Sequence, residues 1–254
     1  MDNRIVIEPA FKIREIARNA LAGYWPRMYL GLFLYFVILS GMMMLLDLFF
    51  STIVNVLLPT GEYLPVSVGY ASWLYQLAIG GPLQYGLALF LLSFLRRREI
   101  DNGHLMDGFS HFGKTFILYL LYCLRIFLWS LLFVIPGIIA VFRYSQAFYL
   151  QADHPDWTAS QCLRESKYLM MGNKGKLFYL NLTFIGWYIL ANLPSLLVDG
   201  LINSVVVFIV LWLLTALPLI VVDLYASVSR TVFYELLTGR LVVSDGYDND
   251  YRNM

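Results

Sequence analysis

The chain has 254 residues, of which 59% are hydrophobic and only 14% are charged, and its formal net charge is +1. This composition excludes an ordinary soluble domain, because such domains carry about 25% charged residues. The near-neutral charge gives no indication of a nucleic-acid partner. We therefore expect an integral membrane protein whose immediate partners are membrane lipids.

Residues 9–22 precede the first long apolar run and have the pattern of an amphipathic helix. Pro9 suits a first helical turn, and Ile13, Ile16 and Ala17 recur on one face. Such a helix either lies on the inner headgroup layer with its apolar face toward lipid, or packs as a cap on the helix bundle. The apolar run that follows it is too long for a signal peptide, so we expect it to be retained as a span.

Six apolar stretches are candidates for transmembrane helices, since a helix needs about 20 residues to cross the hydrocarbon core. They are residues 28–50, 73–95, 116–135, 138–151, 178–198 and 202–222. If the N-terminus is cytoplasmic, the cytoplasmic segments hold all of the 18 Lys and Arg except Arg125 and Arg143. The outer segments 51–72 and 199–201 hold none. This asymmetry follows the positive-inside rule and predicts that both termini are cytoplasmic.

Proline and glycine interrupt two of these stretches. Two glycines and Pro82 lie inside the second span, so this span is either kinked or begins near Pro82. Pro136 and Gly137 separate the third span from the fourth, because one helix from residue 116 to residue 151 would be ~54 Å long, far thicker than the bilayer. We expect a tight outer turn at these two residues, which leaves the fourth span short.

The cytoplasmic segment 152–177 contains a second amphipathic helix. Thr158 and Gln161 have the spacing of a capping box, which satisfies two free amides at a helix start. Leu163 and Leu169 share its apolar face. We expect this helix to lie in the inner membrane interface, because its apolar face would otherwise be exposed.

Together these elements predict an all-α fold. It is a polytopic membrane helix bundle of six transmembrane helices with two interfacial amphipathic helices, in a single domain of residues 1–243. Residues 244–254 are polar, with too little apolar content to pack, and we expect this tail to be disordered.

Several short motifs, most of them after residue 134, carry a resemblance to a known family. They are Ile135-Pro136-Gly137, Arg143-Tyr144-Ser145, Asp153-His154-Pro155, residues 166–174, Lys176-Leu177-Phe178 and Phe184-Ile185-Gly186-Trp187, with weaker matches at residues 18–23 and at Gly81-Pro82. On these motifs the chain resembles the domain-of-unknown-function 975 family of bacterial integral membrane proteins. The resemblance implies a six-span protein of a bacterial cytoplasmic membrane, and it brings no agreed activity and no catalytic residues.

Two arginines inside the predicted spans are the main candidates for a ligand site. Arg125 and Arg143 lie near mid-depth, where an Arg costs about 2.5–3.5 kcal/mol or more, so such residues usually face a partner or a wet cavity. Nearby acids that could balance them are Asp47, Asp199 and Asp223. A bound anion such as a lipid phosphate is the other source of negative charge. The alternative is that both arginines snorkel toward the interface and form one structural ion pair. Gln84, in the second span, would add a polar group to the candidate ligand site.

Lys174 and Lys176 stand at the predicted membrane surface and are candidates for binding lipid headgroups, at about 1 kcal/mol per base.

The three histidines lie in predicted loops without an established ligand spacing, so we expect no metal and no cofactor. No convincing nucleophile–base set stands out either, and we expect no catalytic residues and no enzyme activity. The expected function is movement of a small anionic solute or lipid across or within the membrane. The alternative is a membrane scaffold or interaction protein, bound to another membrane protein, with no substrate of its own.

Overall fold

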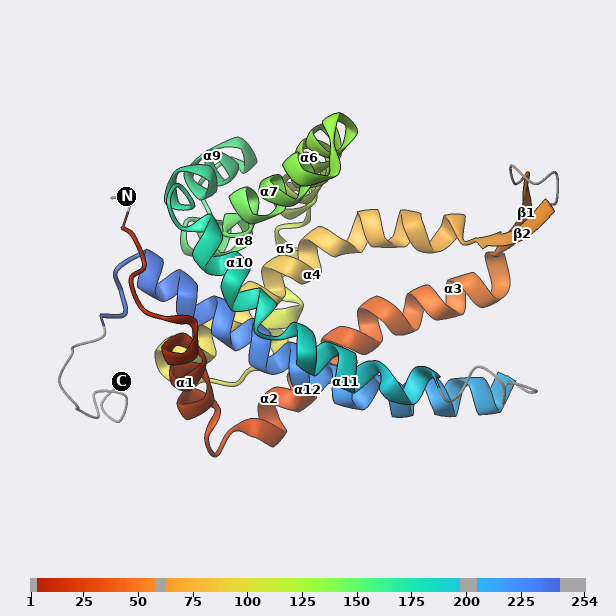
Figure 1. Ribbon diagram of the computed structural model, residues 1–254, viewed down its shortest axis with the longest axis horizontal. Helices are drawn as coiled ribbons and strands as arrows, with labels where there is room; N and C mark the ends of the chain where they lie inside the picture. Colours follow the sequence, from red (N-terminus) through yellow and green to blue (C-terminus); the bar gives the residue numbers. More distant parts are fainter. Residues whose placement is uncertain (1–3, 58–62, 197–204, 243–254) are drawn as a thin grey trace.

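The structure, a computed structural model, describes residues 4–57, 63–196 and 205–242, and within them the fold is all-α apart from one small hairpin. The long helices run side by side along the longest axis of the molecule (Figure 1). The described chain begins and ends at the left of that view, and the hairpin lies at the opposite end. The predicted tail, residues 244–254, lies outside the described residues.

The first half of the chain contains α1 (Ala10–Leu21), α2 (Trp25–Phe36), the π-helical turn η1 (Val37–Gly41), α3 (Met42–Phe50), β1 (Thr52–Leu57), β2 (Tyr63–Val68), α4 (Tyr70–Arg97), the 3-10 turn η2 (Asn102–Leu105), α5 (Asp107–Ser110) and α6 (Phe112–Leu132). The second half contains α7 (Val134–Tyr144), α8 (Ala147–Asp153), α9 (Ala159–Leu169), α10 (Lys174–Leu182), α11 (Ile185–Leu196) and α12 (Val205–Leu237).

Among the described residues, four helical stretches are long and apolar enough to cross a membrane. They are Trp25–Phe50, Tyr70–Arg97, Phe112–Leu132 and Ala216–Leu237. The predicted fourth span is instead two short helices, α7 and α8, and the predicted fifth span is divided between α10 and α11. The count of six spans therefore stays a prediction. The fourth and fifth predicted spans are each broken into two helices.

The segment between α3 and α4, expected to be an outer loop, contains an antiparallel hairpin. Strand β1 pairs with β2 from Thr52 opposite Val68 to Leu57 opposite Tyr63. Four of the six residues of β1 are β-branched (Thr52, Ile53, Val54 and Val56), which explains its extended conformation, because such side chains favour strands. The sequence prediction did not include these strands.

The open question at Pro82 is answered by α4, which is one continuous helix through this residue. The glycines before it are needed for close packing. A Cβ placed on Gly81 would lie 2.5 Å from the backbone oxygen of Thr115 in α6. Helices α4 and α6 therefore approach each other more closely here than any larger residue would allow.

Replacing Gly81 by alanine should destabilise the protein by about 1–3 kcal/mol, because the added methyl meets backbone, which cannot rotate away. Thermal unfolding in detergent measures the effect. The matched control is Gly113→Ala at the start of α6, where a Cβ meets nothing within 4 Å. Equal stability of the two variants would show that the α4–α6 approach is looser than described.

The predicted break between the third and fourth spans is confirmed as a helical hairpin, but its turn lies earlier in the chain. Phe133 is extended (φ −165°, ψ 158°), and α7 begins at Val134 with Pro136 in its first turn, where a missing N–H costs nothing. A Cβ on Gly137 would lie 2.3 Å from the Ser130 hydroxyl, so this glycine lets α7 pack against α6.

Both predicted amphipathic helices are present, as α1 and α9. The capping box of α9 is formed: the Thr158 amide donates to Gln161 Oε1 (2.8 Å), and the Gln161 amide donates to the Thr158 hydroxyl (3.3 Å). The apolar faces are not turned to lipid, because Ile13 of α1 and Leu163 of α9 are fully buried. Helix α1 packs on α12, and α9 packs on α6 and α8. The protein itself covers these faces, which fits the alternative that the first helix packs as a cap on the bundle, and an interfacial position of the two helices stays a prediction.

Candidate functional site

A cavity of about 530 Å³ lies inside the helix bundle, within the size range of small-molecule sites. Its lining residues are Leu32, Tyr35, Phe36, Leu39, Ser40, Gln84, Leu87, Leu91, Tyr122, Val141, Phe142, Ser145, Gln146, Phe148, Tyr149, Leu177, Asn181, Ile220, Asp223, Ser227 and Arg230. They come from both halves of the chain, so the cavity forms only when the bundle is assembled.

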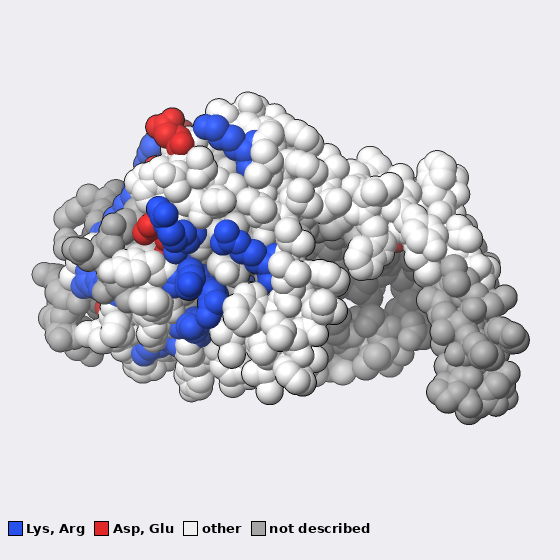
Figure 2. Space-filling model, turned by 90° about the horizontal axis from the view of Figure 1, so that it is seen from above, with Lys and Arg blue, Asp and Glu red and all other residues white. Residues whose placement is uncertain are grey.

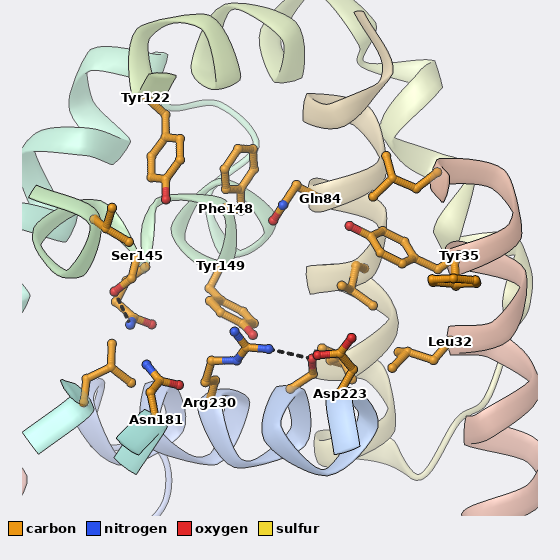
Figure 3. A pocket seen from close by; sticks show the side chains of 18 of the residues that line it. Leu32, Tyr35, Gln84, Tyr122, Ser145, Phe148, Tyr149, Asn181, Asp223 and Arg230 are labelled. Carbon is orange, nitrogen blue, oxygen red and sulfur yellow. Dashed lines mark hydrogen bonds between the residues drawn. The ribbon is translucent and has the colours of Figure 1, made fainter. Parts of the chain in front are cut away.

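The charged groups of the cavity stand on one face of α12. Asp223, Ser227 and Arg230 are spaced four and three residues apart, which places them above one another on a helix. In Figure 3, Arg230 and Asp223 rise from α12 at the bottom of the cavity, and Tyr149 and Gln84 lie above them. Arg230 Nη2 donates to the Ser227 hydroxyl at 3.0 Å.

Asp223 is bound from outside this face. The Tyr188 hydroxyl of α11 donates to its Oδ1 atom at 2.5 Å. Asp223 and Arg230, both described, do not form an ion pair within 4.0 Å of each other, and both are only partly buried. Each charge therefore keeps hydrogen-bonding capacity that faces the cavity.

Amides and aromatic rings complete the walls. Gln84 and Asn181 contribute amide groups from α4 and α10, and the hydroxyl-bearing rings of Tyr35, Tyr122 and Tyr149 come from three other helices. The site combines an apolar body with a small number of placed polar groups, which is typical of ligand sites.

A second polar wall lies between α7 and α8. Gln146 is 2% exposed, and its Nε2 atom donates to the Ser145 hydroxyl at 2.8 Å. Its Oε1 atom is buried and has no hydrogen-bond partner in the described part of the chain. A buried acceptor without a donor is costly, so a donor supplied by a ligand or water would stabilise this wall.

The helices around the cavity are interrupted beside it. The π-helical turn η1 contains the lining residues Leu39 and Ser40, and the break between α7 and α8 contains Ser145 and Gln146. Prolines lie inside α4 and α12, two residues before Gln84 and Ile220. The break between α10 and α11 follows Asn181. Interrupted helices with free backbone groups surround the ligand sites of many membrane transporters.

The structure places Arg125 and Arg143 outside the cavity lining. They lie on the α6–α7 hairpin, with Arg125 5.4 Å from the centre of the Tyr144 ring and Arg143 5.3 Å from that of Trp129. Both are partly exposed, and each is stabilised by a ring of the neighbouring helix. Gln84 lines the cavity, so the structure separates the two arginines from the third predicted residue. Ligand binding by Arg125 and Arg143 stays a prediction.

The lysines predicted to bind headgroups lie at the start of α10. Lys176 Nζ donates to the backbone oxygen of Ile7 at 3.2 Å, so it also ties the N-terminal segment to the bundle. Beside it, buried Asn173 accepts from the Val6 amide at 2.9 Å and donates to the Arg4 oxygen at 2.8 Å. Lys174 is partly exposed. Headgroup binding by either lysine stays a prediction.

The predicted counter-ions of the arginines are dispersed. Asp223 lines the cavity, whereas Asp47 lies at the end of α3 against Gly69, and its Oδ1 atom is buried without a hydrogen-bond partner in the described structure. Asp199 lies outside the described residues. Of the two acids that the structure describes, Asp223 lines the cavity and Asp47 does not.

Arg230 is the functional candidate that sequence reasoning missed. The last span was predicted to end at residue 222, which assigned Arg230 to the cytoplasm. Helix α12 instead continues to Leu237, so Arg230 lies within a helical stretch apolar enough to cross a membrane. The signal was present in the spacing of Asp223, Ser227 and Arg230, which is that of one helix face.

A buried ion cluster lies beside the cavity, at the end of the bundle where the described chain begins and ends. Arg96 binds Asp153 (Nη1–Oδ1, 2.7 Å) and Glu235 (Nη2–Oε1, 2.6 Å), while Tyr234 and Arg240 also donate to Asp153. The Asp153 side chain is 3% exposed. Burial alone would raise the pKa of Asp153, but hydrogen bonds from its two arginines and its tyrosine outweigh burial and lower that pKa below its ordinary value.

The cluster and the cavity share a wall. Tyr149 lines the cavity and stacks on Tyr234 with ring centroids 5.0 Å apart. The Tyr149 hydroxyl also lies 3.2 Å from that of Thr231. The cluster thus fixes α4, α8 and α12 around this end of the cavity. Among the described residues, no group of three or more His, Cys, Asp or Glu is placed to hold a metal ion.

The family model with the description "Protein of unknown function (DUF975)" matches residues 7–141 and 131–241. The chain belongs to this family. The resemblance seen in the sequence motifs is therefore confirmed over nearly the whole chain. No curated protein and no solved structure matches. Since the DUF975 description assigns no activity, the cavity is the basis for inferring one.

Proposed function

We propose that this protein binds a small solute or lipid carrying an anionic group in its central cavity, and moves it across or within the membrane without catalysing a reaction. The observation that carries the proposal is Arg230, a cation inside an apolar helix that faces a cavity of about 530 Å³. A charged residue at such a position is costly unless it serves a partner or a ligand. The cavity offers Arg230 a hydroxyl, but no ion pair within 4.0 Å in the described structure.

The interrupted helices support movement rather than static binding. A cavity wall made of short helices and proline-containing helices can change shape by small rotations about the breaks. The breaks at 145–146 and 183–184 and the π-helical turn η1 all lie near lining residues. The alternating access of a transporter needs this kind of wall, whereas a scaffold does not.

We also propose the location: a bacterial cytoplasmic membrane, with several spans and both termini in the cytoplasm. Figure 2 supports this orientation, since Lys and Arg gather on the half of this face that lies toward the chain ends, and the hairpin half shows none. Cytoplasmic ends of membrane proteins carry this excess of positive charge. Membrane lipids would then cover the exposed apolar side chains of α6, α7 and α11.

The orientation predicts a labelling pattern in whole cells. In a background without Cys123 and Cys162, a cysteine at Thr52 in β1 should react with an impermeant thiol reagent, and one at Lys174 should not. After membrane permeabilisation both should react, because both positions are at least partly exposed. Labelling at position 174 in intact cells would reverse or reject the proposed orientation.

A ligand screen tests the function most cheaply. The purified protein in a non-ionic detergent is heated with lipids and small anions, and a ligand that binds the folded state raises the unfolding temperature. We expect at least one anionic group to do so. No shift across the panel, together with co-purification of a single membrane protein partner, would favour the alternative of a scaffold or interaction protein.

A further inference from the structure

We propose that the ligand is a zwitterion, with its anionic group bound by Arg230 and its ammonium group bound by Asp223 and the surrounding aromatic rings. This inference rests on the proposed function and names its ligand class. The chemistry is shared by a zwitterionic lipid headgroup and by a free solute with phosphate or carboxylate at one end and an amine at the other.

The charge of the cavity favours this class. Among its lining residues, Arg230 is the cation and Asp223 the anion, so the cavity is neutral in sum but polar along α12. A purely anionic ligand would be attracted by Arg230 and repelled by Asp223 at the same time. A zwitterion aligned along the helix meets an opposite charge at both ends, which gives electrostatic complementarity.

The spacing of the two charges fits a ligand of headgroup size. Seven residues along a helix correspond to a rise of about 10 Å, and the long Arg230 side chain shortens that separation, as Figure 3 shows it extending toward Asp223. One Arg230 donor is used by Ser227 and one Asp223 oxygen by Tyr188. A guanidinium has five donors and a carboxylate about four acceptor positions, so both groups have capacity left for a ligand.

Aromatic rings surround the space between these charges. Four aromatic residues from three helices line the cavity: Tyr35 of α2, Tyr122 of α6, and Phe148 and Tyr149 of α8. The faces of such rings attract ammonium groups, especially where water is excluded. They would add nothing comparable for an anion, so the walls discriminate in favour of a ligand with a positive end.

Three matched probes separate the ligand classes: phosphoethanolamine as the zwitterion, glycerol 3-phosphate as the anion and ethanolamine as the cation. Affinities are measured by titration of the full-length protein in a maltoside detergent. We expect phosphoethanolamine to bind about tenfold or more tightly than either single-charge probe. Asp223→Asn keeps an oxygen for Tyr188 and should remove this preference while binding of glycerol 3-phosphate persists or strengthens.

The two sources of the zwitterion are distinguished with lipid nanodiscs. If the protein retains phosphatidylethanolamine over phosphatidylglycerol in an Asp223-dependent way, and free phosphoethanolamine is weak, the ligand is a lipid headgroup. Equal binding of glycerol 3-phosphate and phosphoethanolamine by the wild type would overturn the zwitterion while leaving the proposed function intact. Binding of none of the probes or lipids would overturn both. The two overturning outcomes are read on the wild type, so they hold even if the variant does not fold.

Discussion

Replacing Arg230 by glutamine is expected to weaken ligand binding by roughly 10–100-fold, because the variant loses charge-assisted hydrogen bonds to the anionic group. The folded yield should change little, since among the described residues Arg230 makes one side-chain hydrogen bond, to Ser227, and glutamine can replace it. The measurement is the ligand-induced rise in unfolding temperature. That rise should disappear in the variant while the unfolding temperature without ligand stays near that of the wild type.

Arg143→Gln is the matched control for this variant. Arg143 is also an arginine in a predicted span, but it lies against the Trp129 ring and not in the cavity lining. We expect a loss of stability of about 0.5–1 kcal/mol and an unchanged ligand response. The reverse pattern, with the response lost in Arg143→Gln and kept in Arg230→Gln, would move the ligand site back to the α6–α7 hairpin.

Replacing Asp153 by asparagine is expected to cost about 3 kcal/mol of stability, the lower end of the range for breaking a buried ion pair, because Arg96 and Arg240 are partly exposed. The variant leaves both arginines without their shared carboxylate beside the cavity. Thermal unfolding at neutral pH in detergent measures the loss. A decrease below about 1 kcal/mol would show that solvent already screens the cluster.

The acid sensitivity of the wild type should follow from the same residue. The pKa of Asp153 is lower in the folded state than its ordinary value of about 3.9, so its stabilising effect is complete above that value. The effect is lost as the pH falls through the lowered folded-state pKa. Asp153→Asn should therefore show a flatter loss of stability below about pH 4. The control Asp156→Asn, at an exposed position with no ion pair among the described residues, should behave as the wild type.

Hydropathy and charge placement predicted the class of protein and much of its helical content. Long apolar runs became α4, α6 and α12, because burial in lipid or protein demands internally satisfied backbone hydrogen bonds. The capping box at Thr158 correctly located the start of α9. The hydropathy pattern did not reveal the breaks within the fourth and fifth predicted spans, since a broken helix and a continuous one have the same apolar composition. The strands of the hairpin were missed because charge asymmetry describes sides of a membrane and not local conformation.

The site was only partly predictable. Gln84 lines the cavity, but the arginines chosen for their depth turned out to be stabilised by aromatic rings on the adjacent helix. Depth in a span therefore did not distinguish a cavity residue from one at a helix–helix contact. Arg230 was missed because the span was ended at the first acid, Asp223, although charged residues inside a membrane helix commonly belong to functional sites. Its periodic spacing with Asp223 was the better indicator.

The most direct test of the central claim is transport by the purified protein in proteoliposomes. Vesicles are loaded with the labelled ligand that gives the largest thermal shift, and its movement across the bilayer is followed for wild type, Arg230→Gln and Arg143→Gln. We expect wild type and Arg143→Gln to move the ligand much faster than protein-free vesicles, and Arg230→Gln to fall to the protein-free rate. Equal rates in all four preparations would contradict the assignment of the cavity as a route for solute or lipid.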